Sequence, residues 1–69
     1  MMATTTLKVE GMTCGHCVQA VKVALEGLEG VRSAQVDLQS GRATVDYEEG
    51  RVEQRQMVGA IMDEGYTAE

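Results

Sequence analysis

The sequence predicts an α+β domain in which a four-stranded antiparallel sheet carries two helices on one face. Apolar and polar residues alternate in three segments, and apolar residues recur at steps of three and four in two others. These segments follow one another as strand, helix, strand, strand, helix, and a short apolar-polar segment remains at the end. The resulting order, βαββαβ, is the split βαβ arrangement of the ferredoxin-like sandwich.

The first strand and the first helix lie in the N-terminal half. The stretch "TTTLKVEG" alternates, with Leu7 and Val9 on the side that a core would bury. From Cys17 the period changes to that of an amphipathic helix. Its apolar positions are Val18, Val21, Leu25 and Leu28. Gly27 and Gly30 mark the end of this helix.

A hairpin is predicted next. The stretch "ATVDY" alternates cleanly through Ala43, Val45 and Tyr47, and "QSGR" before it is a turn in which Gly41 can take a positive φ. The preceding strand, "VRSAQVDL", alternates imperfectly. Its apolar residues are Val31, Ala34, Val36 and Leu38.

The second helix is predicted from about Val52 to Glu64, followed by a short final strand in "YTAE". Met57, Val58 and Ile61 would face inward. The start of this helix shows neither a proline nor a strong capping residue, so Gly50 is expected to serve there imperfectly. Gly65 ends the helix.

Residues 1–69 are expected to form a single domain. Its length and its charge limit the functions that it can have. A chain of 69 residues is near the lower limit for folding alone and has no room for a deep substrate pocket, so a small surface site is expected. Eleven acidic against six basic residues give a net charge of −5. This argues against nucleic acid and against an anionic membrane surface. The acidity either steers a partner with a basic face toward the protein or only keeps a small protein in solution, and the sequence leaves both open.

The two cysteines require a chemical explanation. The N-terminus has no apolar run typical of an export signal, and no stretch approaches the ~20 apolar residues of a membrane span. We therefore expect no membrane insertion and a cytoplasmic location, where thiols are kept reduced. A disulfide between Cys14 and Cys17 would close only a tiny loop and stabilise the fold little.

The chemistry of this pair favours a soft metal ion. The stretch "GMTCGHC", residues 11–17, holds both cysteines and the only histidine. Cys17 falls in the first turn of the predicted helix, where free N–H groups and the helix dipole lower a thiol pKa. Two thiolates are too few for structural zinc, which takes four ligands, but they suit Cu(I), and also Ag(I) and Hg(II). Zn(II) is expected to bind only in vitro.

The same seven residues, placed between a first strand and a first helix, resemble the heavy-metal-associated domain family, and within it the small bacterial copper chaperones of the CopZ type. "EGY" at residues 64–66 and the apolar pattern of both halves extend the likeness over nearly the whole chain. The resemblance implies a Cu(I) carrier, not an enzyme. It would pass one ion from Cys14 and Cys17 by thiolate exchange to the metal-binding domain of a copper-exporting P-type ATPase, or to a copper-responsive regulator. The metal-free form is expected to be a monomer, and a metal-bridged dimer remains open.

Five neighbours are candidates for tuning the site: Met12, Thr13, Gly15, His16 and Tyr66. Met12 has a thioether that Cu(I) accepts, yet a packing role is favoured. His16 is expected to point outward and to act through charge or hydrogen bonding, with ligation and bridging in a dimer left open. Tyr66 could cover the sheet edge, but in the chaperones that this chain resembles the matching tyrosine lies beside the metal loop.

Other functions remain as alternatives. The letters Cys-Gly-His-Cys also occur in disulfide isomerases, but such redox centres belong to a larger βαβ domain with a Trp before the first cysteine and a cis-proline nearby. Here Thr13 precedes Cys14, and the chain has neither Trp nor Pro. A thiol-disulfide oxidoreductase is therefore the weaker hypothesis. A mercury or other heavy-metal carrier, or a metal buffer without a dedicated acceptor, fits the same two thiols.

Overall fold

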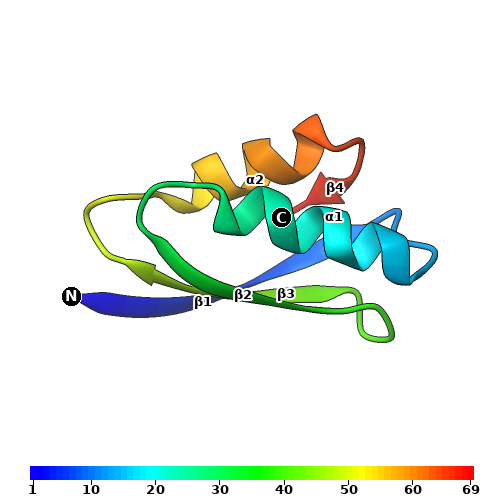
Figure 1. The fold of residues 1–69 in the computed structure, drawn as a ribbon, viewed down its shortest axis with the longest axis horizontal. Coiled ribbons are helices and arrows are strands. Elements are labelled where there is room, and N and C mark those ends of the chain that lie inside the picture. The colour runs from blue at the N-terminus through cyan, green and yellow to red at the C-terminus, as the bar shows by residue number, and fades with distance from the viewer.

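The predicted order of strands and helices is confirmed in the computed structural model, which describes all 69 residues (Figure 1). The four strands form one antiparallel sheet in the order β2-β3-β1-β4, and both helices cover the same face of it. This is the predicted ferredoxin-like sandwich. The elements are β1 Met2–Glu10, α1 Gly15–Glu26, β2 Val31–Asp37, β3 Arg42–Glu48, α2 Gln54–Asp63 and β4 Thr67–Ala68.

The hairpin of β2 and β3 explains why alternation in the second strand is imperfect. Its register shifts between Val31 and Ser33, which is the signature of a β-bulge. At the other end, Gly41 has a φ of 68° and its amide donates to the Asp37 carbonyl. A side chain at Gly41 would also bring a Cβ to 3.1 Å from the Val9 carbonyl oxygen, so the turn requires glycine.

The core lies between the sheet and the two helices and contains only apolar side chains. Alternate residues of β1 and β3 face it, and each helix contributes two fully buried residues. The largest side chains buried there are Leu7, Val21, Leu25, Val45, Met57 and Ile61. No polar side chain is buried, so the fold rests on apolar burial and backbone hydrogen bonds.

Both helices begin at other residues than the sequence predicts. Helix α1 starts at Gly15, two residues before Cys17. Helix α2 starts at Gln54, because Glu53 is its N-cap and forms a capping box with Gln56, whose side-chain oxygen accepts from the Glu53 amide at 2.8 Å. The expectation that Gly50 must cap this helix is therefore wrong.

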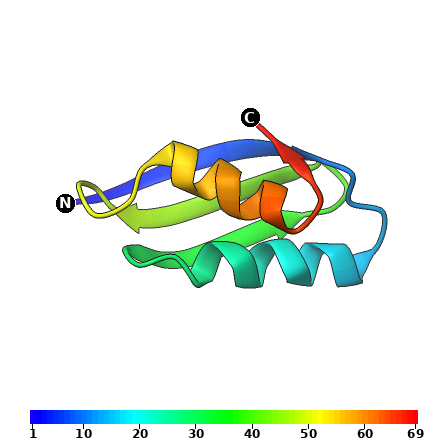
Figure 2. The ribbon, with the colours of Figure 1, turned by 90° about the horizontal axis from the view of Figure 1, so that it is seen from above.

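One end of the molecule gathers the segments that carry the motif. The C-terminal end of β1, the N-terminus of α1, the C-terminal end of α2 and β4 all lie at that end (Figure 2). Gly65, with a φ of 94°, turns the chain from α2 toward β4, so that Tyr66 arrives beside the loop that follows β1. Neither helix is long and apolar enough to cross a membrane.

Candidate metal site

The two thiols stand at the junction of the loop 11–14 and helix α1. Cys14 is the N-cap of α1, and its carbonyl accepts hydrogen bonds from the amides of Cys17 and Val18 at 3.1 and 3.3 Å. Cys17 is the third residue of the helix and therefore lies in its first turn. One turn of helix places the two side chains on the same side, which explains why the motif needs two residues between the cysteines.

Both cysteines are free, and their sulfurs lie 3.7 Å apart. Two metal–sulfur bonds of about 2.3 Å span at most about 4.6 Å, so the pair can reach a single ion. Cys14 is exposed and Cys17 is half-buried. No third His, Cys, Asp or Glu joins them in a cluster, so the protein offers a site of two sulfurs that opens to the surface.

The surroundings of Cys17 stabilise its thiolate. The backbone amide of Thr13 has the largest effect, followed by the hydroxyl of Tyr66, and together with the Cys14 thiol they lower the pKa of Cys17 from its ordinary 9.0 to about 6. The hydroxyl of Thr13 adds a contact of 3.8 Å between its Oγ1 and the Cys17 sulfur. The sequence predicts this direction from the helix dipole, whereas the structure identifies specific donors.

Tyr66 lies beside the thiols and not over the sheet edge alone. Its hydrogen bond to Cys17 raises the pKa of Tyr66, and partial burial and the nearby thiolates act in the same direction. The phenol therefore remains a donor at neutral pH. Gly11, whose φ of 102° favours glycine, lies beside the ring, since a Cβ at that position would be in ordinary contact with the Tyr66 Cδ1 at 3.4 Å.

Met12 and Gly15 differ in their surroundings. The side chain of Met12 is partly buried and packs against the hydrophobic core, which agrees with a packing role. Gly15 is the first residue of α1, and a Cβ added there would meet nothing within 4 Å. The loop that carries the thiols is therefore open to solvent at Gly15 and packs against the core through Met12.

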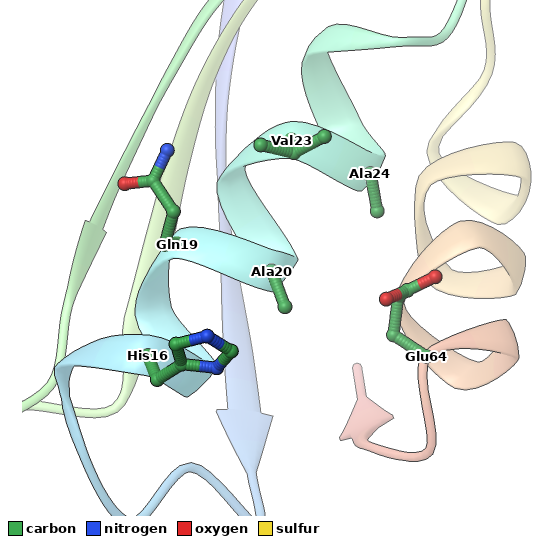
Figure 3. A pocket seen from close by; sticks show the side chains of 6 residues that line it. All are labelled: His16, Gln19, Ala20, Val23, Ala24 and Glu64. Atoms are coloured by element: carbon green, nitrogen blue, oxygen red, sulfur yellow. The ribbon is translucent and has the colours of Figure 1, made fainter.

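His16 is exposed and lies at the rim of a groove between the two helices (Figure 3). The groove has a volume of about 250 Å³, and its walls carry His16 on α1 and Glu64 at the end of α2. The small side chains of Ala20 and Ala24 form its floor. Sequence analysis did not identify this groove, although two alanines four residues apart on one helix were a signal for it.

The sequence of residues 6–67 matches the profile of the heavy-metal-associated domain. The chain belongs to the heavy-metal-associated domain family. Copper chaperone CopZ of Staphylococcus saprophyticus is 49% identical over 65 residues, which are 94% of this chain and 96% of that protein. The predicted family is confirmed.

Two solved structures of other proteins are also similar to this chain. One, a CopZ metallochaperone, superposes with a TM-score of 0.94 at 45% identity, covering 97% of this chain and 100% of that one. The other is the N-terminal domain of a potential copper-translocating P-type ATPase from Bacillus subtilis in the Cu(I)-loaded state. It has a TM-score of 0.94 at 28% identity and covers 100% of this chain and 86% of that one.

Proposed function

We propose that this heavy-metal-associated domain is a cytoplasmic copper chaperone that carries one Cu(I) ion between Cys14 and Cys17. The observation that carries the proposal is the pair of free thiols, 3.7 Å apart, at the N-cap and in the first turn of α1, with no third ligand clustered beside them. Soft, low-coordinate Cu(I) suits two thiolates, and relatives covering nearly the whole chain are named copper chaperones.

The protonation state of the site favours loading at neutral pH. Because the pKa of Cys17 is about 6, this sulfur is already a thiolate there, and an incoming ion need not displace its proton. Thr13 and Tyr66 both stabilise the Cys17 thiolate, whereas the Cys14 sulfur forms a side-chain hydrogen bond only with Cys17. Cys17 is therefore the anchored ligand and Cys14 the mobile one.

Transfer follows from the low number of ligands. A thiolate of the acceptor bonds to the ion while Cys14 is still bound, and the bond to Cys14 then breaks. Its sulfur takes a proton, the acceptor thiol has lost one, and copper stays Cu(I) throughout. Cys17 leaves last, as the second acceptor sulfur replaces it. This sequence parallels thiol–disulfide exchange, in which the incoming thiolate attacks before the old partner leaves.

The acceptor that we propose is the metal-binding domain of a copper-transporting P-type ATPase, or else a copper-responsive regulator. The likeness to a Cu(I)-loaded domain of such an ATPase supports the first. With a net charge of −5 and Glu64 at the wall of the groove beside His16, a basic face on the acceptor is favoured. Nucleic acid is disfavoured on the same ground. The chain acts as a carrier and not as an enzyme.

Native mass spectrometry of the reduced protein, titrated with Cu(I), tests the site. Wild-type protein should bind one ion tightly, whereas Cys14→Ser and Cys17→Ser should each lose tight binding while far-UV circular dichroism is unchanged. Met12→Leu is the matched control, because it removes the thioether but keeps an apolar side chain of similar size. Full affinity in either serine variant, or a loss in Met12→Leu, would sink the assignment of the ligands.

Parallel titrations with Ag(I), Hg(II) and Zn(II) separate the copper carrier from a mercury or general heavy-metal carrier. The Cu(I) affinity is measured by competition with a Cu(I) chelator, with and without excess zinc. Zinc should not displace the copper, because two thiolates satisfy Cu(I) but not the four-coordinate zinc. A transfer assay to a domain with a Cys-x-x-Cys pair, monitored by mass spectrometry, distinguishes a chaperone, which passes its ion on, from a buffer, which keeps it. Rapid turnover of a disulfide substrate would instead support an oxidoreductase.

A further inference from the structure

The sheet leaves most of one edge of β1 unpaired. Strand β4 pairs only with Val9 and Glu10, and Lys8 exchanges both backbone hydrogen bonds with Glu69, at 2.9 and 3.0 Å. Figure 2 shows β4 meeting only the C-terminal end of β1. Backbone N–H and C=O groups alternate in direction along a strand. The groups of every second residue before Lys8 therefore face the same edge of β1 as those of Lys8, the edge on the side of β4. These residues, which have no strand beside them, are Met2, Thr4 and Thr6.

The opposite edge of the sheet is protected in three ways. The Glu26 carboxylate of α1 accepts a hydrogen bond at 3.2 Å from the amide of Ala34 in β2. A bulge interrupts residues 31–33, and Arg32 and Asp37 place charges along the strand. Such devices prevent edge-to-edge pairing in natural sheets. Residues 2–7 of β1 have no charge, proline, glycine or bulge.

We propose that this open edge pairs with the same edge of a second copy of the chain, β1 against β1, antiparallel about a twofold axis at Thr4. In this register, Thr4 exchanges two hydrogen bonds with Thr4 of the second copy, and Met2 does so with Thr6. The interface is isologous, so every contact occurs twice. The two sheets become one continuous sheet.

This register fits the residues that already occupy the edge. Glu69 lies opposite Lys8, and Met2 of the second copy would lie opposite Thr6, so the added strand and β4 do not overlap. The cross-strand pairs are Thr4 with Thr4, Met2 with Thr6 and, on the other face, Ala3 with Thr5. Uncharged and β-branched pairs of this kind are favourable, and the net charge of −5 is not concentrated at the contact.

The pairing is independent of copper. Because the two β1 strands run in opposite directions, their C-terminal ends, and with them both pairs of cysteines, lie at far ends of the joined sheet. A metal-bridged dimer would instead bring the cysteines together. Only a few residues of each copy take part, so the association is weak and the dilute carrier is a monomer. It becomes a dimer at high protein concentration.

Amide exchange in the metal-free, reduced protein tests this at single residues. As the protein concentration rises, sedimentation should detect a dimer, and exchange of the Thr4 and Thr6 amides should slow. The Thr5 amide faces β3 and serves as the internal control, since it is protected at every concentration. A protein that stays monomeric throughout, or a dimer that leaves Thr4 and Thr6 unprotected, would overturn the proposal.

Two charge-matched variants locate the contact. Thr4→Lys places a long charged side chain beside the twofold axis, removes the Thr4 hydroxyl that donates to Asp46 at 2.8 Å, and should abolish the dimer, since an edge lysine opposes strand pairing. Thr44→Lys makes the same charge change on the exposed face of the central strand β3, opposite Thr6, and should leave the dimer intact. Circular dichroism checks the fold of both. The proposal fails if Thr4→Lys dimerises like the wild type, if Thr44→Lys is a monomer, or if the wild type dimerises only with Cu(I).

Discussion

The hydroxyl of Tyr66, three residues from the C-terminal end of the chain, lies near the sulfur of Cys17 in the first turn of α1 and lowers the pKa of that thiol. The contact connects the segment after α2 to the candidate metal site after β1. Gly65 turns the chain toward the loop, and the ring of Tyr66 lies beside Gly11. The reactivity of the thiol pair therefore depends on a residue that is distant in sequence.

Replacing Tyr66 tests this dependence. Tyr66→Phe removes the donor but keeps the ring, so the pKa of Cys17 should rise from about 6 toward its ordinary value, which lies at 9.0. Each unit of increase lowers the thiolate fraction about tenfold at pH values well below the pKa. Thiol alkylation measured against pH, with peptide mass to identify the cysteine, gives the value directly.

Tyr47→Phe is the matched control, because Tyr47 is the other tyrosine, is partly buried against the core, and lies on β3. Removing the Tyr47 hydroxyl should leave the pKa of Cys17 at its wild-type value. If Tyr66→Phe titrates like the wild type, the Thr13 amide alone maintains the thiolate, and the role given to Tyr66 is wrong.

The lowered pKa of Cys17 also predicts how the stability of the metal-free protein depends on pH. Between pH 6 and 9 the thiol is protonated in the unfolded chain and ionised in the native one, so the unfolded state binds more protons. Stability must then rise with pH through this window and is lost as the pH falls through 6. The melting temperature should increase from pH 6 to 9 in wild-type protein.

The same series with Cys17→Ser isolates the contribution of the thiol. The variant should lack the rise, whereas Cys14→Ser should retain most of it, because the Thr13 and Tyr66 donors to Cys17 remain. The raised pKa of Tyr66 affects only more alkaline conditions, since that phenol is protonated in both states below its ordinary value of 10.0. An equal slope in Cys17→Ser would mean that another group is responsible.

Most of the fold could be predicted from the periodicity of the apolar residues. The structure differs from the prediction at helix ends, where this periodicity carries no information. Alternation at Leu7 and Val9 and the turn at Gly41 gave the strands and the hairpin correctly. The sequence predicts that α2 begins at about Val52, an apolar residue close to the inward-facing Met57. In the structure both are buried, but Val52 precedes the Glu53 cap, at the position of a hydrophobic staple. A staple residue and a first helical residue look alike in sequence.

The site could be predicted only in part. The spacing of Cys14 and Cys17 at a helix start predicted two converging sulfurs, which the structure contains at 3.7 Å. The donors that lower the pKa of Cys17 could not be derived from spacing, because the Tyr66 hydrogen bond comes from the other end of the chain and the Thr13 amide acts through loop geometry. Only the family resemblance suggested a place for Tyr66 near the thiols.

The capping box of α2 gives a stability prediction far from the metal site. Gln56→Ala leaves the Glu53 amide without the oxygen that it contacts at 2.8 Å, and losing such a cap costs about 1 kcal/mol. Gln54→Ala is the control, since Gln54 is exposed in the same helical turn and forms no side-chain hydrogen bond. Urea unfolding should separate the two variants. Equal midpoints would mean that the box does not stabilise the helix in solution.

The last prediction concerns what an ion does to the fold. A classical zinc finger is unfolded without its metal, because its core is too small to hold alone. Here eleven buried apolar residues form a core, and neither cysteine belongs to it. The metal-free protein should therefore be folded, and loading should change residues 11–18 with little effect elsewhere.

Amide chemical shifts of the metal-free and Cu(I) forms measure this directly. Large changes should be confined to residues 11–18 and to Tyr66, whose hydroxyl contacts the ligand sulfur. The amides of the capping box at Glu53, at the other end of α2 from Tyr66, should not move. Since the ion binds the native state only, stability should still rise, by about 2.7 kcal/mol at a ligand concentration of one hundred times Kd. Widespread shifts through α2 and the β2–β3 hairpin would mean that folding and metal binding are coupled. A carrier that gives up its ion would then unfold at each delivery, which contradicts the transfer mechanism proposed for Cys14 and Cys17.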